Sequence, residues 1–288
     1  MPSANTNAAS GATAPAPVSR TVSPLALRVV SAALLAPLVL LALYAGWPYA
    51  DALVVVAGSI MAWEATRMLA PPRSRVLEAL TPACVALALA FAAFGQPSTG
   101  LAVVGAAALA FAVGFGTARG VLLGGFLAYL TIGCLGFIWL RQLPEFGLAA
   151  IIVLLAAVWA TDIGAYFSGR SLGGPKLAPR LSPKKTWSGL IGGMISAGAA
   201  VGLAAWLLPE AEHILDGVPV LGFVVLGAAL AVISQAGDLL ESSLKRYVGV
   251  KDASNLIPGH GGVLDRADGL LSASPALALV IWLIHQGG

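Results

Sequence analysis

The chain has 288 residues, of which 58% are hydrophobic and only 10% are charged, and its mean hydropathy is +0.89. Because soluble domains carry about 25% charged residues, this composition excludes an ordinary soluble protein. The net charge is only +3, so the placement of the basic residues is more informative than their sum.

Residues 1–22 are mostly Ala, Ser, Pro, Thr and Asn and have no apolar face, so we predict a disordered tail there. A secretory signal peptide would begin with basic residues followed directly by an apolar core. The first basic residue is instead Arg20, and the apolar run after it is long enough to span a bilayer. We therefore predict a retained first helix.

Apolar runs of about twenty residues recur along the rest of the chain, which predicts an all-α, polytopic membrane protein with about nine transmembrane helices. Breaks that contain Pro or Gly separate most of these runs. The division between the fourth and fifth runs is the weakest. The predicted spans are 25–45, 49–69, 76–95, 100–117, 120–140, 147–168, 187–208, 218–244 and 268–286.

The basic residues predict the orientation of these spans. If the N-terminus is cytoplasmic, the loops after spans two, four, six and eight are cytoplasmic as well. Those loops and the N-terminal region contain every Lys and Arg of the chain except Arg141. The opposite loops contain acids instead: Asp51, Glu145, Glu210, Glu212 and Asp216. The positive-inside rule therefore predicts a cytoplasmic N-terminus and cytoplasmic polar loops after spans six and eight.

The polar segment after span six, residues 168–193, contains five basic residues and no acid. Its SPKKTW sequence ends where span seven begins, which places Ser182, Thr186 and free backbone N–H groups near a helix N-terminus. Such a terminus favours anions, and Lys184 and Lys185 add positive charge. Basic loops also occur simply as determinants of topology, and the basic residues alone leave that alternative open.

Asp162 lies inside the sixth span. A carboxylate near the centre of a bilayer costs roughly 2.5–3.5 kcal/mol, so we expect Asp162 to be paired or functional. Tyr166 lies one helical turn further along the same face, and we include it in the same candidate site.

The second polar segment, residues 234–269, concentrates acids, bases, hydroxyls and glycines. On a helix, one face would carry two carboxylates, a hydroxyl and an ammonium, from Asp238, Glu241, Ser242 and Lys245. Asp265 and Asp268 would share a face at the start of span nine. If the two faces meet, their carboxylates repel, and a divalent cation would relieve that repulsion. Solvation at a helix end remains an equal alternative for Glu241 and Asp252.

Bases and glycines accompany these acids. Lys245, Arg246, Lys251 and Arg266 could neutralise phosphate, and Gly259, Gly261 and Gly262 would let the backbone approach a ligand closely. His260 could be a ligand, a phosphate donor or a turn residue. Carboxylates and bases without a Cys or His cluster favour magnesium and phosphate over zinc, and the chain has no P-loop and no nucleophile elbow. The residues therefore indicate metal-assisted phosphoryl chemistry, on a lipid, at the cytoplasmic membrane surface.

The run SLKRYVGVKDASNLIPGHGGVLDRAD, from Ser243 to Asp268, resembles the signature of phosphatidate cytidylyltransferases, also called CDP-diacylglycerol synthases. The segments WATDIGAYFSGR and LSPKKTWSGLIGG are similar to other characteristic blocks of that family. The resemblance covers roughly residues 159–193 and 234–269, whereas the first five spans are only generically similar. It implies that CTP and phosphatidate give CDP-diacylglycerol and diphosphate with magnesium, and it leaves open a second, monovalent cation.

The resemblance also implies roles for individual residues. We expect Asp238, Asp265 and Asp268 to hold the metal, directly or through water, and to be catalytic together with Lys245 and Arg266. The expected substrate-binding residues are Ser182, Lys184, Lys185, Thr186, Asp162, Tyr166, Ser242, Arg246, Lys251, Asp252, His260, Gly261 and Gly262. Residues 23–145 would then form a transmembrane scaffold, and residues 146–288 a catalytic region.

The expected partners are CTP, phosphatidate and the lipid bilayer, with no nucleic acid, and a homodimer stays open. The resemblance implies a multi-pass protein of the cell membrane with its active site on the cytoplasmic side. One alternative is a CTP-dependent enzyme that acts on another lipid phosphate. A second is a cation-coupled transporter, although we find no internal repeat of the kind that such proteins usually show. A third, a CDP-alcohol phosphotransferase, matches only the start of its motif at Asp265, Asp268 and Gly269, because Leu270–Ala273 departs from the expected continuation.

Overall fold

The computed structural model describes residues 24–70, 75–115 and 117–286, so the predicted tail at 1–22 lies outside the described residues. Within the described part, nine helices are long and apolar enough to cross a membrane, which confirms the all-α polytopic prediction. The helices are α1 Pro24–Ala45, α2 Tyr49–Leu69, α3 Arg75–Ala93, α4 Pro97–Phe115, α5 Ala118–Gln142, α6 Gly147–Leu172, α7 Trp187–Leu207, α8 Val220–Val248 and α9 Leu264–Gln286. A short 3-10 helix, η1 (Pro209–Ile214), precedes α8.

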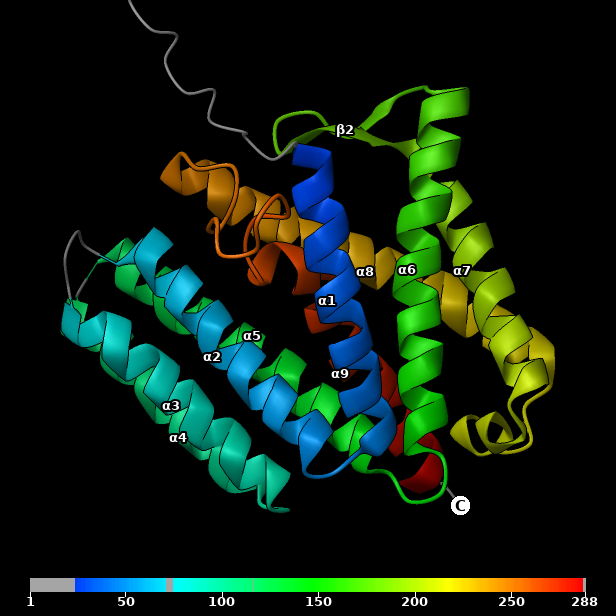
Figure 1. The fold of residues 1–288 in the computed structure, drawn as a ribbon, viewed down its shortest axis with the longest axis horizontal. Coiled ribbons are helices and arrows are strands. Elements are labelled where there is room, and N and C mark those ends of the chain that lie inside the picture. The colour runs from blue at the N-terminus through cyan, green and yellow to red at the C-terminus, as the bar shows by residue number, and fades with distance from the viewer. Residues whose placement is uncertain (1–23, 71–74, 116, 287–288) are drawn as a thin grey trace, which may run out of the picture.

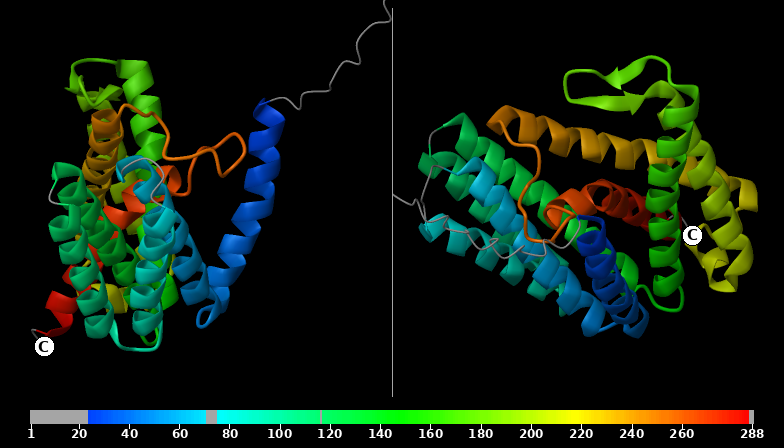
Figure 2. Two further views of the ribbon diagram at one scale, coloured as in Figure 1. Left: turned by 90° about the vertical axis from the view of Figure 1, so that its left-hand side faces the viewer. Right: turned by 45° about the horizontal axis from the view of Figure 1, so that its top comes forward.

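The helices form two groups that meet at α9. Helices α2, α3, α4 and α5 pack on one side, and α6, α7 and α8 pack on the other (Figure 1). Helix α9 lies between the groups and contacts both α5 and α8. Helix α1 leans away from the bundle at its N-terminal end (Figure 2), and little of its surface is buried by the rest of the chain. Any side chain near the start of α9 is therefore within reach of both groups.

Small residues allow these helices to approach closely. A Cβ atom at Gly133 of α5 would lie 2.6 Å from the carbonyl oxygen of Leu271 in α9, so only glycine fits at this crossing. Gly193 of α7 lies against Thr161 of α6 in a similar way, where a Cβ would be 3.1 Å from the Thr161 carbonyl oxygen. Close backbone approach between small residues is a common basis of helix association in lipid. Both of these glycine contacts join helices of the same chain rather than two copies of it.

The polar segment after α6 is more ordered than the sequence indicates. It forms a two-stranded antiparallel hairpin of β1 (Lys176–Ala178) and β2 (Ser182–Thr186). Thr186 ends β2 and also caps α7, because its hydroxyl oxygen accepts a hydrogen bond from the Gly189 N–H at 3.1 Å. The predicted helix N-terminus is therefore present, and the hairpin holds the preceding lysines in a defined position.

Each of the last two helices differs from its predicted span at the end that adjoins the α8–α9 connection. Helix α8 continues to Val248, and Gly249 follows in the left-handed conformation with φ of 80°, as is common at helix C-termini. Helix α9 begins at Leu264, four residues before the predicted start of its span at 268. The α8–α9 connection (residues 249–263) turns back into the bundle, so α9 starts partway down it (Figure 1). Its first acids therefore lie below the polar end of the molecule.

Candidate active site

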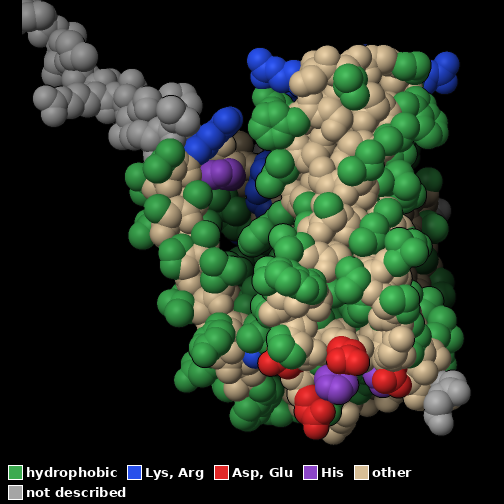
Figure 3. Space-filling model, turned by 90° about the vertical axis from the view of Figure 1, so that its right-hand side faces the viewer, with side chains coloured by type: hydrophobic (Ala, Val, Ile, Leu, Met, Phe, Trp, Pro, Cys, Tyr) green, Lys and Arg blue, Asp and Glu red, His purple; other side chains and the backbone are tan. Residues whose placement is uncertain are grey.

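The polar segments lie together at one end of the bundle. The start of α1, the β1–β2 hairpin, the end of α8 and the α8–α9 connection all lie at the upper end in Figure 1. On the face drawn in Figure 3, Lys and Arg side chains lie mostly toward that end, and Asp and Glu side chains gather at the other. On this face the basic side chains therefore lie at one end of the molecule, as the positive-inside pattern predicts.

Asp238 joins α8 to the hairpin. Its Oδ2 atom lies 2.5 Å from the Nζ atom of Lys185 in β2, and its Oδ1 atom accepts a hydrogen bond from the Ser242 hydroxyl at 3.2 Å. Lys185 also donates to the Gln235 carbonyl oxygen at 3.5 Å. The Asp238 side chain is 32% exposed, so it remains open to a ligand. The structure therefore brings together three predicted site residues from the two polar segments.

Lys245 is the centre of a buried cluster of charges. Its Nζ atom lies 2.8 Å from Glu241 Oε1, one turn earlier on α8, and 2.8 Å from Asp265 Oδ1 on α9. The side chains of Lys245, Glu241 and Asp265 are 12%, 2% and 6% exposed. The predicted polar faces of α8 and α9 do meet here. Because this lysine neutralises two buried acids, its contacts favour a structural role over direct contact with substrate.

Asp265 also organises the α8–α9 connection. Its carboxylate accepts hydrogen bonds from the backbone N–H groups of Ala253, at 3.0 Å and 3.2 Å, and Gly262, at 2.8 Å. Together with Lys245, these donors occupy both carboxylate oxygens. Ligation of a metal by Asp265 stays a prediction, and it would require some of these contacts to break.

Asp268 lies one turn after Asp265, in the first turns of α9. Its Oδ1 atom accepts a hydrogen bond from the Gly269 N–H at 2.8 Å. Its carboxylate lies within electrostatic reach of Asp238 on α8 and Asp162 on α6. Asp162 in turn lies near Lys185 and Arg266. Acids from three helices are therefore close enough to interact electrostatically, and we call the region between them, near Lys185 and Arg266, the common region.

The common region can be compared with what a cation requires. Among the residues that the structure describes, no three acidic, His or Cys side chains are grouped closely enough to make a complete metal site. Magnesium in phosphoryl-transfer sites, however, is commonly bound by one or two carboxylates together with water and substrate phosphates. Asp238 and Asp268 supply suitable oxygens, and their mutual repulsion would be relieved by a cation. These two carboxylates therefore fit a magnesium ion that would take its remaining ligands from water and substrate phosphates, and magnesium binding stays a prediction.

Other predicted residues lie around this region without joining it. Ser182 and Lys184 lie on β2, where Lys184 is exposed, and Arg246 is exposed near the end of α8. The Tyr166 hydroxyl accepts a hydrogen bond from Arg170 one turn later, at 2.7 Å. Substrate binding by these residues stays a prediction.

Lys251 and Asp252 line an open cavity between α2 and the α8–α9 connection, with a volume of about 690 Å³. Arg67 lies in the same cavity and stacks on Trp63, with its guanidinium carbon 4.9 Å from the ring centroid. Substrate binding by Lys251 and Asp252 likewise stays a prediction.

His260 contacts the first helix. Its Nδ1 atom lies 2.9 Å from the Ser31 hydroxyl, and Arg28 donates from Nε to the Gly259 carbonyl oxygen at 2.8 Å. Gly261 has a φ of +91°, a conformation that favours glycine, and it closes a turn with Ile257. Helix α1 thus touches the α8–α9 connection beside the site. Arg28 served only as a topology marker in the sequence, because nothing there indicated this contact.

Glu64 of α2 is a residue that sequence reasoning missed. It is fully buried, and its carboxylate accepts hydrogen bonds from the Ser254 hydroxyl, the Val263 N–H and the Leu264 N–H. A signal was present, because Glu64 is an acid inside an apolar span, as Asp162 is. The predicted division at residue 145 stays untested, although residues from α1 and α2 clearly reach the site.

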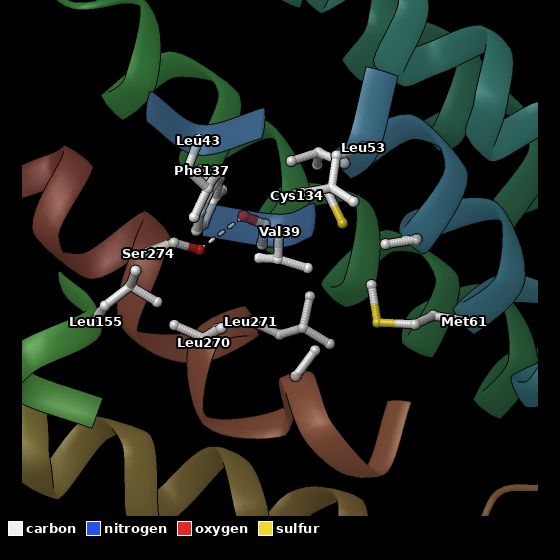
Figure 4. Close-up of a pocket in the computed structure, with 14 residues that line it drawn as sticks. Val39, Leu43, Leu53, Met61, Cys134, Phe137, Leu155, Leu270, Leu271 and Ser274 are labelled. Carbon is white, nitrogen blue, oxygen red and sulfur yellow. Dashed lines mark hydrogen bonds between the residues drawn. The ribbon is translucent and has the colours of Figure 1, made fainter. Parts of the chain in front are cut away.

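An apolar cavity of about 180 Å³ lies deeper in the bundle (Figure 4). It is lined by side chains from α1, α2, α5, α6 and α9, including Val39, Met61, Cys134 and Leu271. Ala267 and Leu270 also line it, and they flank Asp268 in the sequence. A space lined mostly by hydrocarbon therefore lies beside the first turns of α9.

Comparison with known proteins identifies the family of the chain. The model of the cytidylyltransferase family matches residues 26–284. The phosphatidate cytidylyltransferase of Brucella suis biovar 1 (strain 1330) is 51% identical over 153 residues, which cover 53% of this chain and 54% of that protein. The protein of the same name from Haemophilus influenzae is 50% identical over 133 residues, or 46% of this chain and 45% of that protein.

The phosphatidate cytidylyltransferase of Bacillus subtilis (strain 168) is 42% identical over 147 residues, covering 51% of this chain and 52% of that protein. The chain therefore spans about half the length of the relatives it matches. The family match, by contrast, extends from α1 to the end of α9. We conclude that this multi-pass membrane chain belongs to the cytidylyltransferase family.

Proposed function

We propose that the protein is a phosphatidate cytidylyltransferase, which uses CTP and phosphatidate to make CDP-diacylglycerol and diphosphate. The observation that supports this most strongly is that the carboxylates of Asp162, Asp238 and Asp268, from three helices, lie within electrostatic reach of one another, with Lys185 and Arg266 near Asp162. The relatives named phosphatidate cytidylyltransferase agree with this choice of substrates.

In the proposed reaction, an oxygen of the phosphatidate phosphate attacks the α-phosphorus of CTP. The bond from that phosphorus to the bridging oxygen of the β-phosphate breaks, and diphosphate leaves with the electron pair. No covalent enzyme intermediate is needed, because the substrate phosphate is itself the nucleophile. Two polyanions must approach each other, so catalysis depends on positioning and on neutralising charge.

The side chains of this chain have distinct parts in that scheme. Asp238 and Asp268 would hold magnesium, which when bound would neutralise phosphate charge and stabilise the departing diphosphate. Lys185, whose Nζ atom lies 2.5 Å from Asp238, would bind a substrate phosphate beside that carboxylate. Arg266, which is exposed beside these acids, would bind a second phosphate. The apolar cavity beside the first turns of α9 would accommodate at most part of one acyl chain of a lipid substrate.

We also propose that the end bearing the hairpin faces the cytoplasm, in a cell membrane. The basic side chains gather at that end, as Figure 3 illustrates, and a cytoplasmic site would have access to CTP.

The test is turnover by the purified full chain in mixed micelles, with labelled CTP and phosphatidate. We expect formation of CDP-diacylglycerol together with one diphosphate, and loss of at least 100-fold of the rate when EDTA removes magnesium, because the carboxylates would then repel the substrates. Release of CMP, or equal rates with and without magnesium, would contradict the proposal. Turnover of a polyprenyl phosphate but not of phosphatidate would assign the chain to another lipid.

A further inference from the structure

One carboxylate from another helix, that of Glu64 in α2, binds both the α8–α9 connection and the start of α9. Glu64 Oε1 accepts hydrogen bonds from the Ser254 hydroxyl at 2.5 Å and the Val263 N–H at 3.0 Å, and Oε2 accepts one from the Leu264 N–H at 2.8 Å. Leu264 is the first residue of α9. Glu64, which is 200 residues away in the chain, therefore acts as the cap of α9.

This capping is favourable for a buried carboxylate. The first N–H groups of a helix have no partner within the helix, and the N-terminus carries partial positive charge. Glu64 is 0% exposed, so its charge depends on these donors. In return, the start of α9 is fixed to α2, a member of the group formed by α2, α3, α4 and α5.

The space around the carboxylate is also matched to it. A Cβ atom at Gly262 would lie 2.6 Å from Glu64 Oε1 and 3.0 Å from Oε2, so glycine is required there for the carboxylate to fit. The Gly262 N–H meanwhile donates to Asp265 at 2.8 Å. The carboxylates of Glu64 in α2 and Asp265 in α9 thus accept hydrogen bonds from consecutive backbone N–H groups at residues 262–264.

Building on the proposed function, we infer that Glu64 is a positioning residue for cytidylyl transfer. It caps α9 one turn before Asp268, and through that cap it sets where Asp268 lies relative to Asp238 on α8. Glu64 itself points at backbone groups rather than at the acids that face the common region. Its removal should therefore change the placement of Asp268 without removing any group that touches substrate.

The experiment compares the full chain carrying Glu64→Gln or Glu64→Ala with the wild type. The matched control is Glu212→Gln, because Glu212 is an exposed acid on η1. The amide introduced by Glu64→Gln would keep the shape of the side chain but must turn its NH₂ group toward at least one N–H or hydroxyl donor. We expect kcat to fall roughly 10- to 100-fold, because small misplacement of reacting groups has effects of that size. The loss should appear mainly in kcat rather than in KM for phosphatidate, because Glu64 itself contacts no substrate.

A second measurement separates positioning from simple loss of stability. Hydrogen–deuterium exchange should increase in peptides covering residues 250–266 of Glu64→Gln, while exchange in α3 and α4 stays as in the wild type. Gly262→Ala should produce the same selective loss of kcat, since the new Cβ displaces the carboxylate. The double variant Glu64→Asp, Gly262→Ala should lose less than the product of the two single effects, because the shorter acid leaves room.

The outcomes distinguish this inference from the proposed function. Wild-type protein that fails to use phosphatidate would refute the function, yet the exchange measurement would still report whether Glu64 holds the connection. Active wild-type protein together with Glu64→Gln of unchanged kcat and unchanged exchange would overturn the inference. So would a general rise of exchange across all helices with kcat per folded molecule unaltered, because that result would make Glu64 a stabilising residue only.

Discussion

Asp238→Asn and Asp268→Asn are each expected to reduce CTP-dependent transfer to phosphatidate by on the order of 10²–10³-fold. Both substitutions keep the shape of the side chain but remove a negative charge that faces the common region. A cation held by fewer carboxylates binds more weakly and neutralises phosphate less well. Turnover of labelled CTP by purified variants, at several magnesium concentrations, measures this effect, and high magnesium should restore part of the rate.

The matched control is Asp216→Asn, an exposed acid in the connection between η1 and α8. Its φ of 26° lies in a region that Asn tolerates well, so the control should retain its fold and full activity. Wild-type rates in either Asp238→Asn or Asp268→Asn would remove that residue from the metal site.

Lys245→Met should strongly destabilise the folded protein. It would leave Glu241 and Asp265 buried without their shared cation, and breaking a buried ion pair in this way typically costs about 3–5 kcal/mol. Thermal unfolding in detergent measures the loss. Adding Glu241→Gln should recover part of it, because a neutral amide is less costly to bury than an unpaired carboxylate.

Lys184→Met is the matched control for stability, because Lys184 is exposed on β2 and should change the unfolding temperature little. An unfolding temperature of Lys245→Met equal to that of the wild type would mean that the charge cluster contributes nothing to folding. Lys245 would then be free to act on substrate, as the resemblance implies.

The helices were predictable from the sequence because a bilayer imposes one strong requirement. Each span needs about twenty apolar residues, and the breaks at Pro and Gly mark their ends. The starts and ends that tertiary contacts determine were less accessible. Helix α9 begins at Leu264 rather than at 268, and Glu64 accepts a hydrogen bond from its first N–H group. No local sequence pattern in residues 249–268 indicates that a residue of α2 would cap this helix.

The site was predictable to the extent that helical periodicity places residues on one face. The spacing of Glu241 and Lys245 predicted their shared face, and the contact of Lys245 with Asp265 confirms that the faces of α8 and α9 meet. The pairing of Lys185 with Asp238 depended on a β-hairpin that short polar strands do not reveal. Glu64 was missed because it lies far from both polar segments, although its position inside a span was a usable signal.

The central claim is that acids of α8 and α9 hold a divalent cation between two phosphate-bearing substrates. Electron paramagnetic resonance of Mn²⁺, with purified full chain and CTP in micelles, tests it most directly, because it reports cation binding without requiring turnover. The account predicts one tightly bound Mn²⁺ per active chain in the wild type, with affinity lowered at least tenfold in Asp238→Asn and in Asp268→Asn. Equal Mn²⁺ affinity in the wild type and both variants would contradict it.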